Sequence, residues 1–125
     1  FMQIRESAED YLEAILVLSK KGGGVRSVDI ASMLGVSKPS VSHAMKFLRE
    51  DGYIAMDRYG TVTLMDKGSE IAHRIYERHT VLTKMLEGLG VSPEVARADA
   101  CKMEHDVSDE SFEKIKEHLT AKGEI

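Results

Sequence analysis

Apolar residues recur every three or four positions over most of the chain, which is the period of an amphipathic helix. The first helix is expected at 6–20, where one apolar stripe is formed by Ala8, Tyr11, Leu12, Ile15, Leu16 and Leu18. Ser7 is its candidate N-cap, because an acid follows three residues later. Three consecutive glycines at 22–24 end this helix, since glycine is unfavourable in a helix interior.

Glycines and hydroxyl residues divide the next part of the chain into two helices and a hairpin. Ser27 is the candidate N-cap of a short helix that Gly35 ends. Ser37 is the candidate N-cap of a longer helix at 38–50, which carries Pro39 in its first turn. Two short strands are expected within 53–66, with a turn at 58–60.

Three further amphipathic helices complete the pattern. They are expected at 66–88, 92–106 and 108–121, with Ser108 as the candidate N-cap of the last. The order helix, short helix, turn, longer helix and hairpin is typical of a winged helix-turn-helix domain. We therefore predict a mainly α fold, with a winged helix-turn-helix domain at 1–70 and an all-helical domain at 71–125.

The composition fits an ordinary globular protein: 125 residues, 42% hydrophobic and 30% charged. No apolar run approaches the roughly 18 residues that span a bilayer, so we expect no membrane partner. The single cysteine excludes an internal disulfide and suits a reducing compartment such as the cytoplasm.

The charge distribution changes the interpretation of the helix at 38–50. The net charge of −4 counts mildly against DNA binding, yet no acidic residue lies between Ile30 and Arg49. Hydroxyls and cations at a helix N-terminus suit phosphate oxygens and base edges in a major groove. The candidate DNA-binding residues are Ser37, Lys38, Pro39, Ser40, Ser42, His43 and Lys46, with Arg58 and Tyr59 at the hairpin tip. The alternative is a winged-helix scaffold for protein contacts.

Potential metal ligands occur at helical spacing in two places. Asp10 and Glu13 are three residues apart, so they leave one face of the first helix. The stretch CKMEH places Cys101, Glu104 and His105 on one face of a later helix by the same geometry. A further histidine is at position 79, on the long helix between them. One thiolate, three carboxylates and two imidazoles suit one or two first-row metal ions.

Each of these features also has an ordinary structural interpretation. A lone cysteine is usually a small core residue, and an acidic pair is usually a solvated helix turn. The same spacing rule would nominate His73, which has Glu70 and Glu77 nearby, and we interpret that trio as a charged surface. Spacing alone therefore leaves the metal site open.

Several longer stretches together resemble the metalloregulator family of the diphtheria toxin repressor and the manganese transport regulator. The matching segments are AEDYLEAI (8–15), SVDIASMLGVSKPSVS (27–42), TLMDKGSEIA (63–72), ERHTVL (77–82) and ACKMEHDVSDE (100–110). The resemblance implies a metal-dependent DNA-binding repressor. It also implies that the helical second domain binds the metal and forms a homodimer.

The resemblance also implies ligands, position by position. Those that match ligands in both branches of the family are His79, Glu104 and His105. Asp10 and Glu13 are similar to ligands of the manganese-sensing branch. Cys101 matches the cysteine of the iron-sensing branch, where the manganese branch has a bridging Glu. The chain therefore looks like a hybrid, with a manganese-type Asp10 beside an iron-type Cys101.

We thus expect a transcriptional repressor, not an enzyme, that binds an operator in double-stranded DNA and controls metal-ion uptake genes. The expected metal is Mn²⁺ or Fe²⁺, with Co²⁺, Ni²⁺ or Zn²⁺ as substitutes in vitro, and no organic substrate is expected. Metal affinity should fall as the pH drops, because binding displaces protons from the ligands. The alternatives are a winged-helix regulator that senses redox state or an organic ligand, and a metal-dependent hydrolase, which lacks a nucleophile motif here.

Overall fold

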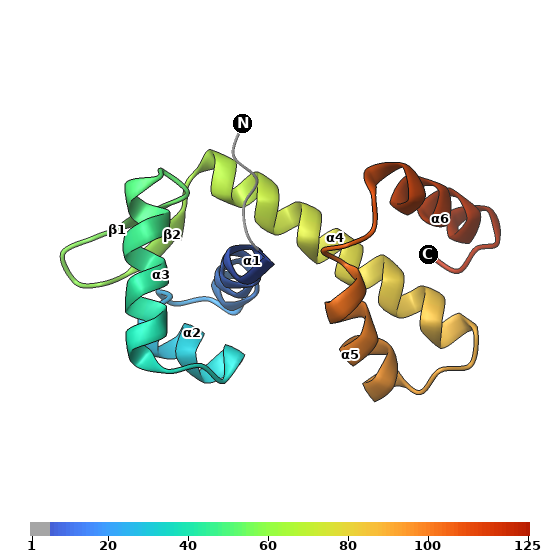
Figure 1. The fold of residues 1–125 in the computed structure, drawn as a ribbon, viewed down its shortest axis with the longest axis horizontal. Helices are drawn as coiled ribbons and strands as arrows, with labels where there is room; N and C mark the ends of the chain where they lie inside the picture. The colour runs from blue at the N-terminus through green and yellow to red at the C-terminus, as the bar shows by residue number, and fades with distance from the viewer. Residues whose placement is uncertain (1–5) are drawn as a thin grey trace. The chain divides into compact units, whose positions relative to one another are not determined.

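The computed structural model describes residues 6–125 as a mainly α chain with one small sheet, as predicted (Figure 1). The elements are α1 (Glu6–Lys20), α2 (Ser27–Leu34), α3 (Lys38–Glu50), β1 (Ile54–Met56), β2 (Val62–Leu64), α4 (Asp66–Gly88), α5 (Pro93–Met103) and α6 (Asp109–Ala121). Two compact units divide the chain, the first ending at His73 and the second starting at Arg74. None of the helices in the described range is long and apolar enough to cross a membrane.

The first unit is a three-helix core with a hairpin. α1 packs on α2 and α3, and the hairpin strands β1 and β2 pack against α3 and α1 respectively. The strands are antiparallel, with Ile54 opposite Leu64, and Val25 adds an isolated bridge to Val62. Leu12, Ile30 and Leu48 are completely buried at the centre. This packing fixes α3, the proposed DNA-reading helix, on one side of the unit.

The helix starts follow the side chains that reach backbone N–H groups. Ser37 caps α3, because its hydroxyl accepts a hydrogen bond from the N–H of Ser40. The prediction for Ser27 is wrong: Ser27 is already helical and Arg26 is the N-cap of α2. The carboxylate of Asp29 accepts from the Arg26 N–H at 3.0 Å, which starts the helix one residue earlier. Ser7 lies inside α1 and is not its N-cap either.

The hairpin tip forms where the sequence predicts a turn, and Asp57 organises it. Its Oδ1 accepts hydrogen bonds from the N–H groups of Tyr59 (2.8 Å) and Thr61 (2.9 Å). Gly60 has φ of 83°, which a glycine adopts at little cost. The tip therefore holds Arg58 and Tyr59 on a locally ordered turn.

The second unit consists of the rest of α4 together with α5 and α6. Val81 of α4 packs with Phe112 and Leu119 of α6, and the residues that surround this cluster are Met85, Val107 and Ile115. Apolar residues of α4 and α6 therefore make the core that holds the two helices together.

The helix α5 is shorter than predicted. It ends at Met103, whereas the sequence pattern extends to 106. The Glu104 N–H still bonds to the Ala100 carbonyl, but the N–H groups of Asp106 and Val107 both turn back to Met103. Glu104 therefore follows the helical path, and the chain leaves it directly afterwards.

Ser108 caps α6, since its hydroxyl accepts from the Ser111 N–H at 3.1 Å. We expect Ser108→Ala to lower the free energy of unfolding by about 1 kcal/mol, because that N–H loses its partner. Thermal unfolding followed by circular dichroism measures this loss. Ser111→Ala, inside the same helix, is the control and should change the stability by less than about 0.5 kcal/mol. Equal losses in both variants would contradict the cap.

Candidate metal centre

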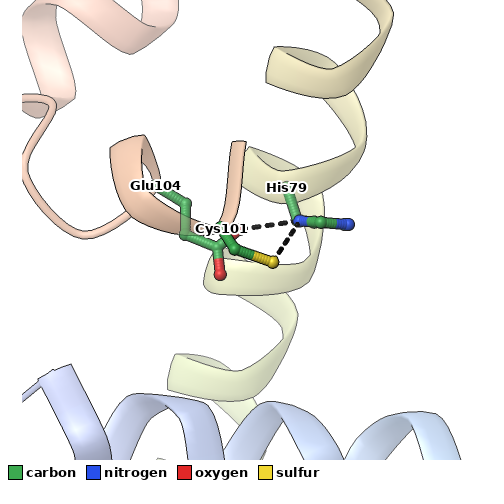
Figure 2. A group of neighbouring side chains, drawn as sticks. All are labelled: His79, Cys101 and Glu104. Carbon is green, nitrogen blue, oxygen red and sulfur yellow. Dashed lines mark hydrogen bonds and ion pairs between the residues drawn. The ribbon is translucent and has the colours of Figure 1, made fainter. Parts of the chain in front are cut away.

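Three potential metal ligands converge in the second unit. His79 comes from α4, Cys101 from the last turn of α5, and Glu104 from the residue directly after α5 (Figure 2). One ligand atom from each side chain lies within 4.8 Å of the other two. Residues 101 and 104 are one helical turn apart, so their side chains leave the same side. The helix α4 brings in the third ligand from 22 residues away in sequence.

The carboxylate of Glu104 is the most unusual group of this cluster. Only 1% of Glu104 is exposed, which is rare for an acidic side chain. Its Oε2 is 2.9 Å from Nδ1 of His79. Its Oε1 is buried, accepts no hydrogen bond from the described residues, and is 3.6 Å from Nε2 of His105. A buried anionic oxygen of this kind is suited to bind a cation.

One ring nitrogen of His79, Nδ1, lies close to both of the other side chains in the cluster. Nδ1 is 2.9 Å from Glu104 Oε2 and 3.7 Å from Cys101 Sγ. Figure 2 shows the second ring nitrogen pointing away from both. In the tautomer that donates to the carboxylate, Nδ1 carries a proton. Binding a metal through Nδ1 requires that this proton leaves.

The donor set fits a divalent first-row metal ion. An imidazole nitrogen, a thiolate and a carboxylate are common ligands of Fe²⁺, Co²⁺ and Zn²⁺, whereas Mn²⁺ prefers oxygen. Cys101 is exposed and has no disulfide partner, so its thiol is accessible to a metal. The Oε1 of Glu104, which is buried and accepts no hydrogen bond from the described residues, and the close approach of three ligand types together support this fit.

The other predicted ligands are Asp10, Glu13 and His105. Asp10 and Glu13 lie one turn apart on α1 in the first unit, and both are partly buried. The side chain of His105 is 3% exposed and follows Glu104 in the turn after α5. The structure groups His79, Cys101 and Glu104 within one unit, while the roles of Asp10, Glu13 and His105 as ligands stay predictions.

His73 illustrates why spacing alone is a weak signal. Its Nδ1 is 2.8 Å from the Ser69 carbonyl oxygen and 3.2 Å from the Ser69 hydroxyl, on the same helix. The side chain is exposed. This exposure agrees with its interpretation as part of the surface.

The predicted DNA-binding residues are all exposed in the first unit. They are Ser37, Lys38, Pro39, Ser40, Ser42, His43, Lys46, Arg58 and Tyr59. The hydroxyls of Ser37 and Ser40 bond to each other at 2.8 Å. The guanidinium of Arg58 lies 5.0 Å from the centre of the Tyr59 ring. Their contact with DNA stays a prediction, which their exposure permits.

Sequence reasoning missed Arg78, which is 2% exposed and bonds to the main chain of Glu104. A charged residue in a helix is normally read as solvated. The signal was its position: Arg78 is three residues after Ile75 and four before Leu82, on the buried stripe of α4. A cation on an apolar stripe indicates a buried polar contact.

Two family models match the chain and together cover most of it. Residues 3–62 match the N-terminal DNA-binding domain of the iron-dependent repressors. Residues 65–121 match the metal-binding and dimerisation domain of the same group. The predicted order of a winged helix-turn-helix domain and an all-helical metal-binding domain is therefore confirmed.

Among curated proteins, the chain is 42% identical over 118 residues to the transcriptional regulator MntR of Escherichia coli O6:H1. The match covers 90% of this chain and 76% of that protein. It is 35% identical over 109 residues to the HTH-type transcriptional regulator MntR of Lysinibacillus sphaericus, which covers 87% and 77%.

Solved structures give the same picture. A manganese-dependent transcriptional repressor in complex with manganese is 30% identical, with a TM-score of 0.84 over 90% of this chain and 52% of its own. The manganese regulator SloR is 28% identical, with a TM-score of 0.81 over 95% and 55%. The chain thus spans about half the length of these two structures and about three quarters of the curated relatives.

Proposed function

Since the chain belongs to the iron-dependent repressor family of metal-dependent transcriptional regulators, we propose that Mn²⁺ or Fe²⁺ controls its binding to operators of metal-uptake genes. The observation that carries this proposal is the cluster of His79, Cys101 and Glu104. These three residues would hold the ion, with Asp10, Glu13 and His105 as the further ligands that the sequence predicts. A bound divalent ion supplies positive charge that offsets the carboxylates.

The chain's own residues prepare this site for an ion. Glu104 keeps a buried oxygen without a hydrogen bond. Folding has already removed this oxygen from water, so metal binding does not have to overcome that desolvation free energy again. His79 presents Nδ1 to the cluster, and in the tautomer that donates to Glu104 a proton occupies the position that an ion would take. Cys101 contributes a soft thiolate once its proton is lost. Metal and protons therefore compete for the same atoms.

The DNA-binding role is proposed for the exposed N-terminal part of α3. Lys38 and Lys46 carry positive charge, and no acidic residue of the stretch between Ile30 and Arg49 offsets it. Phosphate contacts of this kind give affinity, whereas Ser42 and neighbouring side chains would contact base edges. The active species is proposed to be a homodimer, because the matched second domain is a dimerisation domain.

The choice between the two metals follows from opposing ligands. Two of the similar solved structures are named as a manganese regulator and a manganese-dependent repressor. The carboxylate of Asp10 is a ligand that Mn²⁺ prefers, whereas the thiolate of Cys101 favours Fe²⁺. We propose that both ions bind and that Fe²⁺ binds more tightly than Mn²⁺, which is also the general order of stability for these two ions.

The proposal is tested by selecting binders from a pool of random-sequence duplex DNA. The protein is incubated in parallel with Mn²⁺, with anaerobic Fe²⁺, and with a chelator at the same ionic strength. We expect enrichment of one sequence with either metal and none with the chelator. Equal enrichment in all three arms would exclude the metal switch.

A variant separates the metal role from the DNA role. Lys46→Ala should bind the selected duplex more weakly and with a smaller salt dependence, while its metal affinity is unchanged. The redox alternative makes a different prediction: DNA binding would need no metal and would respond to peroxide through Cys101. The similarity to metal-dependent regulators does not favour that alternative.

A further inference from the structure

Arg78 is a buried cation next to the metal cluster but is not one of its ligands. Its Nη1 donates to the carbonyl oxygen of Glu104 at 3.1 Å and also to that of Val107. Its Nη2 donates to Oδ1 of Asp109 at 2.5 Å. The guanidinium carbon is 5.2 Å from the centre of the Phe112 ring. One side chain of α4 thus contacts both ends of the turn between α5 and α6 and the start of α6.

These contacts satisfy carbonyl groups at the C-terminal end of α5. The last carbonyl groups of a helix have no partner within the helix, and they are costly when buried. Arg78 donates to the carbonyl directly after α5 and to another three residues later. Asp109, the first residue of α6, supplies the negative charge that a buried guanidinium requires. The fork of the guanidinium can donate to all three acceptors, whereas an ammonium group has a different geometry.

Two consecutive residues of α4 therefore contact Glu104, one at its main chain and one at its side chain. Arg78 binds its main-chain carbonyl, and His79 contacts its carboxylate. A metal ligand has to be held within about 0.5 Å of its productive position. In the turn at 104–107, the N–H groups of three residues bond back to α5, whereas the carbonyl groups of Glu104 and Val107 accept from Arg78, so Arg78 fixes the acceptor side of the turn.

We propose that Arg78 is the positioning residue of the metal centre, and that it sets the place of Glu104 by fixing the turn between α5 and α6. This inference rests on the proposed function of the cluster. Residues that orient a metal ligand in this way typically change metal affinity by about 10- to 100-fold when they are replaced. A purely structural arginine would change the stability of the unit and leave the affinity of the folded protein unaltered.

The test uses the full chain and Co²⁺, whose absorption spectrum reports both thiolate binding and ligand geometry. Arg78→Lys keeps the charge and removes the fork. We expect its Co²⁺ affinity to fall by about 10- to 100-fold. The spectrum of its saturated complex should also differ from that of the wild type. All titrations are made well below the unfolding temperature of each variant, so that only folded protein is compared.

Lys116→Met is the matched control. Lys116 of α6 bonds to Glu77 of α4 at 2.6 Å, so it links the same two helices without contacting the turn. That carboxylate raises the pKa of Lys116, which is therefore charged at neutral pH. The control should keep both the wild-type affinity and the wild-type spectrum. An Arg78→Lys protein with unchanged affinity and spectrum would overturn the proposal.

A second variant covers the case in which Arg78→Lys does not fold. Asp109→Asn leaves the guanidinium in place and removes its charged partner, whose side chain is 84% exposed. We expect a smaller but measurable loss of Co²⁺ affinity, and wild-type affinity in this variant would then overturn the proposal. The experiment distinguishes a failure of the metal site from a failure of the role of Arg78. A wild type without a thiolate–Co²⁺ band contradicts the metal site itself, whereas a wild-type band that all variants share contradicts only the role of Arg78.

Discussion

Glu104→Gln is expected to lower the affinity for Mn²⁺ and Co²⁺ by at least about 100-fold, or about 2.7 kcal/mol. The substitution keeps the size of the side chain and removes the negative charge of a ligand that is 1% exposed. A neutral amide is a poor substitute for a carboxylate on a divalent cation. Isothermal titration and metal-dependent binding of the selected duplex both measure this loss.

Two measurements keep that result from being explained by unfolding. The metal-free variant should be as stable as the wild type or more stable, because a buried carboxylate without full compensation is unfavourable. Glu110→Gln removes an exposed acid from the first turn of α6 and should retain full affinity. If Glu104→Gln bound metal like the wild type, the cluster in Figure 2 would not be the metal centre.

Gly68→Ala is expected to destabilise the first unit by about 3 kcal/mol or more. A Cβ atom at position 68 would overlap the carbonyl oxygen of Tyr53. That carbonyl cannot easily move, because it accepts the N–H of Met65 at 2.9 Å and begins the hairpin. Thermal or urea unfolding followed by circular dichroism should show the loss.

Gly88→Ala is the control in the same helix. A Cβ atom there would meet the carboxylate of Glu124, which is the end of a flexible side chain. Alanine is favoured over glycine in a helix by up to about 1 kcal/mol, which offsets the displacement. The control should therefore stay within about 1 kcal/mol of the wild type. A similar stability of both variants would show that the approach to Tyr53 is not tight.

The helix pattern was predictable from the sequence because burial imposes a period, and that period is visible in the residues. The apolar stripe of α1 has five of its six predicted members buried, with Leu18 partly exposed. The helix ends were less predictable, because they depend on single hydrogen bonds. Ser37 and Ser108 cap as expected, but the carboxylate of Asp29 places the start of α2 at Ser27.

The candidate site shows the same division. Cys101 and Glu104 were predicted together because one turn of helix separates them. Their meeting with His79 depends on how α4 and α5 pack, which spacing within one helix does not determine. Arg78 was not predicted, because two of its partners are main-chain carbonyl groups, which a sequence does not display, and the third, Asp109, lies 31 residues away.

The exposed cations of α3 belong to a chain whose net charge is −4. If α3 binds DNA as proposed, its cations should attract an approaching duplex, whereas the net negative charge of the chain should repel one that approaches elsewhere. Collisions in the wrong orientation should therefore separate quickly, and residence on arbitrary DNA should be short. During the search for an operator, most encounters that last would then be those in which α3 already faces the groove.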